Sequence, residues 1–278
     1  MKYSEVYLGE NSDRWYRVNL GNQTEDFPSV NTILRTTESP ENKKRLANWK
    51  RKQAEKFFNA NRTCKNCLFY QSSLTSKTLS LVDHACGVGE KLRSPIDKKH
   101  RCKSFALNAE MEAARVAHGE KARERGSEVH KHIQNWFDFG IMPTPEHCKY
   151  ASKIPHLLKN LAEGKILVEE FVISQEHGYC GRVDFCGRYA GQIPVTDWVT
   201  TDRSFLQAEN FERKFLQCAG YAIAIEEMKL ATPTEIMVVA MSPTEARLFR
   251  EPLEKWVELW LKRVELFWEM QAPEGVPF

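Results

Sequence analysis

The sequence has 278 residues, of which 42% are hydrophobic and 11% aromatic, enough to bury one sizeable core and to argue against disorder. Its formal net charge of +3 is too small for a general polyanion binder, so a nucleic-acid site would have to be a local patch. The sequence shows no signal or transit peptide and no apolar run that could span a bilayer. We therefore expect an intracellular, cytoplasmic protein with no membrane partner.

The N-terminal part, residues 1–61, is predicted to contain a strand at 13–19, a helix capped by Ser29 or Asn31, and a basic helix at 42–61. The basic residues of the last helix are Lys43, Lys44, Arg45, Lys50, Arg51, Lys52 and Lys56. Such a stretch is a candidate nucleic-acid patch. On charge alone, a solvated helix face explains it equally well.

Residues 62–106 contain four closely spaced cysteines in a polar segment with little periodicity. These are Cys64, Cys67, Cys86 and Cys102, with His84 and His100 beside the last two. An intracellular chain keeps cysteines as thiols or metal ligands, and a Cys-x-x-Cys pair with two further thiolates can form a closed site. We expect a structural Zn²⁺ site, with a 4Fe-4S cluster as the alternative. Four unliganded thiols are the third interpretation.

Residues 107–278 have the pattern of a folded core that begins with a helix at 107–139, interrupted at 125–127. In the second half of this helix, His130 shares a face with Ile133 and Phe137 and is predicted to point inward. An inward histidine of this kind is more often a satisfied core residue than a ligand.

Acidic residues recur on the strands that follow. An apolar strand at 165–174 carries Glu169 and Glu170, which project to opposite faces and leave open which one faces a site. Two further strands, turned near residues 189–191, carry Asp184 and Asp197. Pairing would bring these two carboxylates together, and a hard divalent cation would offset their repulsion. The alternative is that both are solvated at strand ends.

The remaining elements complete an α/β pattern. A helix at 210–225 carries Gln217 and Tyr221 one turn apart, and a strand at 234–241 and a helix at 253–268 end the chain. The order of helix, three strands, helix and strand predicts a mixed central sheet flanked by helices.

Several short motifs resemble those of the PD-(D/E)XK nuclease superfamily. Gly181-Arg-Val-Asp184, a hairpin and Asp197-Trp-Val-Thr-Thr201 resemble motifs II and III of the RecB-like branch, which includes mitochondrial, phage and CRISPR-associated exonucleases. Arg125-Gly-x-x-x-His130 and Gln217-x-x-x-Tyr221 resemble two further motifs of that branch, in the right order. The resemblance implies a restriction-endonuclease-like core, to which the cysteine-rich metal-binding segment is an insertion.

The resemblance also implies an activity, which is phosphodiester hydrolysis in single-stranded DNA, attacked from an end. Its implied Mg²⁺ or Mn²⁺ ligands are Asp184, Asp197, His130 and the main-chain carbonyl of Trp198. Its implied nucleic-acid contacts are Gln217, Tyr221, Trp49 and Lys50. Protein partners would belong to DNA replication, repair or recombination.

One departure from the family concerns the catalytic lysine. Val199 stands two residues after Asp197, where the family has its lysine. The chain would then be a weakened enzyme or a DNA-binding or assembly subunit that has lost catalysis, unless another lysine reaches the same space. Lys214, three residues before Gln217, is the candidate, although a solvated lysine on an exposed edge is the commoner situation. An unrelated zinc-containing interaction protein is the remaining hypothesis.

Overall fold

The computed structural model describes residues 2–8, 13–61, 70–72, 84–86, 109–201 and 207–272. The chain divides into two compact units, one made of residues 1–38 and 125–278 and the other of residues 39–124. Residues 1–38 belong to the first unit, because the N-terminal strands pack on its main sheet.

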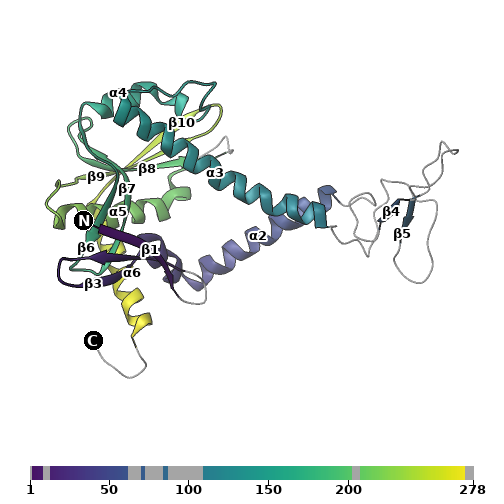
Figure 1. Ribbon diagram of the computed structural model, residues 1–278, viewed down its shortest axis with the longest axis horizontal. Helices are drawn as coiled ribbons and strands as arrows, with labels where there is room; N and C mark the ends of the chain where they lie inside the picture. Colours follow the sequence, from purple (N-terminus) through teal and green to yellow (C-terminus); the bar gives the residue numbers. More distant parts are fainter. Residues whose placement is uncertain are drawn as a thin grey trace. The chain divides into compact units, whose positions relative to one another are not determined.

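The first unit is built on a mixed five-stranded sheet with the strand order β10-β9-β8-β7-β6 (Figure 1). The strands are β6 (Lys165–Ser174), β7 (Tyr179–Gly187), β8 (Pro194–Thr200), β9 (Glu235–Met241) and β10 (Ala246–Pro252). Only the β8–β9 pair of this sheet is parallel. A parallel pair needs a crossover connection, which helix α5 (Glu212–Glu227) supplies. The predicted α/β class and mixed sheet are confirmed.

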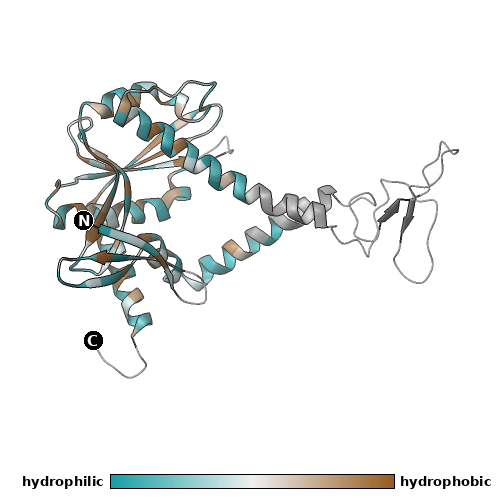
Figure 2. Ribbon diagram, viewed as in Figure 1, coloured by the Kyte–Doolittle hydropathy of each residue, from teal (hydrophilic) through white to brown (hydrophobic). Residues whose placement is uncertain are grey.

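Helices cover both faces of this sheet. The end of α3 (Ala109–Phe139) and the short α4 (Pro155–Ala162) pack on one face, and α5 and α6 (Glu254–Gln271) pack on the other. Apolar residues concentrate on the central strands between these layers (Figure 2). Helices α5 and α6 approach closely at Gly220, where an added Cβ would lie 2.7 Å from the Trp260 ring.

The N-terminal residues form a small sheet beside the main one. It contains β1 (Lys2–Leu8), β2 (Asp13–Asn19) and β3 (Thr24–Pro28), and α1 (Val30–Thr36) follows. Of the two predicted caps of α1, Ser29 is the one used, because its Oγ accepts a hydrogen bond from the Thr32 amide at 3.0 Å. Apolar side chains of β2 and β3 pack against Ile173 and Cys180 of the main sheet, which joins this sheet to the first unit.

The second unit contains α2 (Pro40–Asn61), the short strands β4 (Tyr70–Ser72) and β5 (His84–Cys86), and the beginning of α3. The described basic side chains of α2 are exposed; they are Lys43, Lys44, Arg45, Arg51 and Lys52. Cys64, Cys67 and Cys102 lie outside the described residues, as do the side chains of Cys86, Trp49 and Lys50. None of the described helices is long and apolar enough to cross a membrane.

The expected interruption at residues 125–127 was wrong, because α3 continues through it. A single glycine costs a helix about 1 kcal/mol, and an added Cβ at Gly126 would lie 3.9 Å from Thr200 Oγ1, an ordinary contact. Burial of Val129, Ile133 and Phe137 on the sheet offsets that cost. The continuous helix fixes the direction in which His130 points.

Candidate metal centre

Asp184 and Asp197 lie opposite each other where β7 and β8 separate. The ladder between these strands pairs Cys186 with Val195 and Phe185 with Thr196, so the two aspartates occupy the next position of the same register. Both residues are buried, with 7% and 2% of their surfaces exposed. The Trp198 amide donates a hydrogen bond to Asp184 Oδ2 at 3.0 Å instead of continuing the ladder. The hairpin therefore gathers two carboxylates at a strand end with few donors to satisfy them.

His130 reaches the same point from α3. Its Nδ1 lies 3.0 Å from Glu169 Oε1 and 3.7 Å from Asp184 Oδ2, and its Nε2 lies 3.1 Å from the Trp198 carbonyl oxygen. Val129 and Ile133 bury the neighbouring face of the helix and hold the ring in place. Ligand atoms of His130, Glu169 and Asp184 lie within 4.8 Å of one another, so the histidine lies among potential metal ligands rather than in the apolar core.

Glu169 is the acidic residue of β6 that faces the site, whereas Glu170 is exposed. Glu169 has a φ of 49°, a left-handed conformation that a glutamate rarely adopts and that costs on the order of 1–3 kcal/mol. It is opposite Asp184 in the register that pairs Val168 with Phe185 and Glu170 with Val183. Strain of this kind persists where the surrounding structure imposes it, and here it directs a carboxylate to His130.

Lys214 approaches from α5 on the opposite face of the sheet. Its Nζ lies 3.0 Å from each carboxylate oxygen of Asp197 and donates a hydrogen bond to Oδ1. Asp197 Oδ2 is buried and takes no hydrogen bond. Lys214 is therefore paired with the second acid and is not a solvated lysine on an edge. Val199 is half-buried and packs against the apolar core below α5.

Burial and neighbouring charges shift the pKa values of Asp184, His130 and Lys214. Burial, with the neighbouring charge of Asp197, raises the pKa of Asp184 to about 7. Burial alone would lower the pKa of His130, but Asp184 and Glu169 outweigh it and raise that pKa to about 9. Burial likewise opposes the charge on Lys214, yet Asp197 and Asp184 raise its pKa. The site holds more negative charge than its own cations offset.

The donor atoms fit a divalent metal ion. Carboxylate and carbonyl oxygens with one imidazole nitrogen suit Mn²⁺ and Mg²⁺, and the histidine favours Mn²⁺. Asp197 Oδ2 is buried and takes no hydrogen bond in the described structure, although Lys214 Nζ lies 3.0 Å from it, and burial beside Asp197 raises the pKa of Asp184. A bound cation would satisfy both, so the residues present fit the ion that the sequence predicts.

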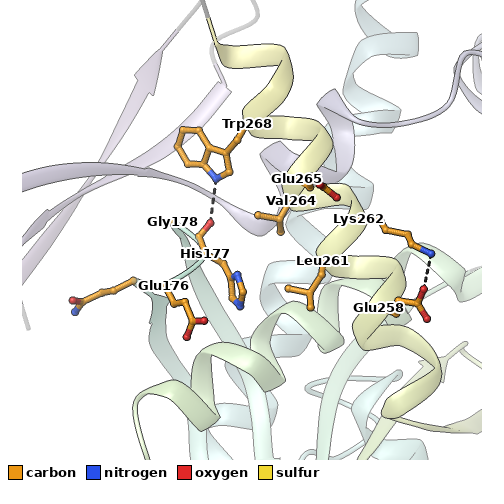
Figure 3. A pocket seen from close by; sticks show the side chains of 10 residues that line it. Glu176, His177, Gly178, Glu258, Leu261, Lys262, Val264, Glu265 and Trp268 are labelled. Atoms are coloured by element: carbon orange, nitrogen blue, oxygen red, sulfur yellow. Dashed lines mark hydrogen bonds and ion pairs between the residues drawn. The ribbon is translucent and has the colours of Figure 1, made fainter. Parts of the chain in front are cut away.

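A second group of potential ligands contains Glu176, His177 and Glu227. Glu227 accepts hydrogen bonds from Ser174 Oγ at 2.5 Å and from the Glu176 amide at 3.3 Å. Trp268 Nε1 donates to the His177 carbonyl oxygen at 3.1 Å beside a pocket of about 570 Å³ (Figure 3). These bonds fasten the turn between β6 and β7 to α5 and α6, which gives the group a structural role.

Gln217 and Tyr221 are both buried, with 5% of their surfaces exposed. This leaves almost no ring surface of Tyr221 for a base to stack on.

The sequence signal for Lys214 was its position three residues before Gln217, whereas no signal distinguished Glu169 from Glu170. No protein-family model matches the sequence, and no curated protein is significantly similar to it.

Proposed function

We propose that this chain is a metal-dependent nuclease with a restriction-endonuclease-like core of the PD-(D/E)XK type, and that it hydrolyses single-stranded DNA from an end. The observation that carries the proposal is the convergence of His130, Glu169 and Asp184 within 4.8 Å of one another. Asp197 and the Trp198 carbonyl stand beside them at the end of the mixed sheet. A helix histidine and acids on neighbouring strands are the ligand set that the sequence motifs imply.

Some residues of the site would bind the ion, and one would orient a ligand. His130, Asp184, Asp197 and the Trp198 carbonyl would hold Mg²⁺ or Mn²⁺, and Glu169 would fix the histidine ring through Nδ1. The bound ion would lower the pKa of a water molecule and offset charge on the scissile phosphate. Glu169 has a ligand atom close enough to bind the ion directly as well.

Lys214 would supply the positive charge that Val199 cannot. In the related nucleases, a lysine two residues after the second acid positions the water and stabilises the phosphate. Here a lysine on α5 contacts that same acid, with Nζ 3.0 Å from both oxygens of Asp197. The contact supports migration of the catalytic lysine from strand β8 to α5, and hence an active enzyme.

The test is a cleavage assay on single-stranded oligonucleotides labelled at the 5′ or the 3′ end, with Mg²⁺ and with Mn²⁺. We expect metal-dependent release of short products from one end. Asp184→Asn should abolish it, and Glu170→Gln is the matched control because it alters an exposed carboxylate of the same sheet. Cleavage that persists in Asp184→Asn would exclude this site as its source.

The alternative is a nuclease-fold subunit that binds DNA or assembles a complex without cutting. Val199 favours it, because valine offers neither a charge nor a proton donor. In that case the parent protein binds Mn²⁺ and oligonucleotides without cleavage, and Val199→Lys either gains activity or stays inert with the metal bound. A protein that fails to bind oligonucleotides in fluorescence anisotropy would belong to neither class.

For residues 62–106 we propose structural zinc held by the four cysteines, with a 4Fe-4S cluster as the alternative. A closed thiolate site can stabilise a segment with few apolar residues. Metal analysis of anaerobically purified protein, with a visible absorption spectrum, separates the two. Cys64→Ser should lower the metal content, whereas the control Cys148→Ser alters a buried free thiol of the first unit.

A further inference from the structure

Three side chains on one face of α5 form a continuous hydrogen-bonded series that ends at the candidate metal centre. Lys214 Nζ donates to Gln217 Oε1 at 3.3 Å, and Gln217 Nε2 donates to Tyr221 Oη at 3.1 Å. At the other end, Lys214 contacts both oxygens of Asp197 at 3.0 Å. The series links a tyrosine two helical turns away to the acid of the metal centre.

The amide of Gln217 has two unlike ends, and each has a partner. Its carbonyl oxygen faces the ammonium group and its NH₂ faces the phenol oxygen. If the amide flipped, it would place two donors, NH₂ and ammonium, against each other. The ammonium group therefore fixes which end of Gln217 meets Lys214, and the Tyr221 hydroxyl, which can donate or accept, holds the other end of the amide in place.

The Tyr221 ring is held by the sheet below it. An added Cβ at Gly181 would lie 2.7 Å from Cε1 of this ring, a distance that real contacts do not reach. Gly181 is on β7, the strand that carries Asp184. Only a glycine at this position leaves room for the ring, and the packing holds the phenol oxygen near the strand.

We propose that Gln217 and Tyr221 are positioning residues that hold Lys214 against Asp197, instead of contacting nucleic acid themselves. The placement of the lysine follows from the contacts alone, while its effect on cleavage rests on the proposed function. Burial of both residues supports the proposal, since groups that are 5% exposed offer little to a DNA strand.

The first experiment measures the reactivity of Lys214 and needs no cleavage. Metal-free full-length protein is treated briefly with acetic anhydride, and acetylation of Lys214 is quantified by mass spectrometry relative to the exposed Lys229. Tyr221→Phe and Gln217→Met should raise Lys214 labelling several-fold. Gln217→Glu should stay near the parent value, because a carboxylate still accepts from both Lys214 and the Tyr221 hydroxyl.

The matched control is Tyr179→Phe. Its hydroxyl is also buried against α5 and donates to the Gly220 carbonyl oxygen at 2.9 Å, outside the series. Lys214 labelling should not change in this variant. Equal increases in Tyr179→Phe and Tyr221→Phe would show general loosening of α5 and overturn the proposal, as would unchanged labelling in Tyr221→Phe and Gln217→Met.

The second experiment measures cleavage kinetics in the same variants. Loss of one hydrogen bond to a charged group should lower kcat about tenfold, with the KM for DNA unchanged. A raised KM with normal kcat would show contact with DNA and overturn the positioning role. If the parent does not cleave at all, the proposed function fails, and the labelling result alone decides the positioning role.

Discussion

Two groups in the first unit place a histidine and two carboxylates close together, yet they differ in what surrounds the carboxylates. His130, Glu169 and Asp184 form one group, and Glu176, His177 and Glu227 form the other, each with ligand atoms within 4.8 Å. Geometry of the ligand atoms alone does not separate them. The difference lies in how fully the protein's own donors satisfy the acids.

In the second group, Glu227 accepts one hydrogen bond on each oxygen, from the Ser174 hydroxyl and the Glu176 amide. Beside the first group, Asp197 keeps a buried oxygen without a hydrogen bond, and Asp184 carries a pKa raised by burial to about 7. Buried carboxylates are costly unless cations offset them, and here Lys214 and His130 are two cations among the three carboxylates of Glu169, Asp184 and Asp197. The comparison therefore favours the first group as the candidate metal site and gives the second a structural role.

The largest effect is expected for Asp184→Asn, which should abolish Mn²⁺ binding at the core. The substitution removes a charged ligand while leaving a group that can still accept the Trp198 amide hydrogen bond. Calorimetric titration with Mn²⁺ measures the loss, and thermal unfolding checks that the fold is intact. Parental Mn²⁺ affinity in Asp184→Asn would show that the group of His130, Glu169 and Asp184 is not the metal site.

Lys214→Met should lower the cleavage rate by a factor on the order of 10²–10³. It deletes a charge 3.0 Å from Asp197 but no metal ligand, so Mn²⁺ binding should persist. Adding Val199→Lys to this variant should restore part of the rate, because position 199 lies two residues along the same strand. Full activity in Lys214→Met would show that the lysine only balances the charge of Asp197.

Much of this site could be predicted from strand and helix periodicity. The direction of a side chain on a strand or helix follows from its spacing to the apolar residues. The sequence alone could therefore place two acids on paired strands and an inward histidine on a helix. Glu169 could not be chosen over Glu170, because its φ of 49° breaks the alternation on which such a choice depends. Left-handed backbone at a glutamate is imposed by the surrounding fold, and strand propensities do not indicate it.

Lys214 shows the same limit at longer range. Its spacing from Gln217 places it on the right helix face, but contact with Asp197 depends on how α5 packs against β8. That packing follows from close contacts between α5 and the sheet, such as Gly181 of β7 against the Tyr221 ring, which join residues far apart in the sequence. The continuity of α3 through Gly126 was likewise decided by burial on the sheet rather than by local propensity.

The pH dependence of stability should sharpen the comparison further. In the metal-free protein, the pKa of Asp184 rises from 3.8 to about 7 and that of His130 from 6.5 to about 9. Because both folded-state values are raised, the stability linked to Asp184 is lost as pH rises from about 4 to 7, and that linked to His130 from about 6.5 to 9.

The Tm of metal-free Asp184→Asn relative to the parent should therefore increase between pH 4 and pH 7, since the variant has no buried acid to ionise. Thermal unfolding of both proteins across this range, with a chelator present, is the measurement. Adding Mn²⁺ should stabilise the parent most at the upper end of the range. A Tm difference that stays constant with pH would show that Asp184 ionises normally in the folded protein.

The smallest effect is expected for Glu227→Gln. Glutamine has one carbonyl oxygen in place of two carboxylate oxygens, so it can accept from the Ser174 hydroxyl or from the Glu176 amide but not from both through separate oxygens. Because the glutamate side chain is 20% exposed and water can replace part of the contact, the loss of stability should be about 1 kcal/mol. Urea unfolding measures this loss of stability against the control Glu226→Gln, which changes an exposed neighbour.

Mn²⁺ titration of Glu227→Gln should give the parental stoichiometry, since a carboxylate whose oxygens already accept hydrogen bonds from the protein has little to gain from an ion. Loss of one bound Mn²⁺ in Glu227→Gln would show that hydrogen-bond satisfaction does not separate the two groups.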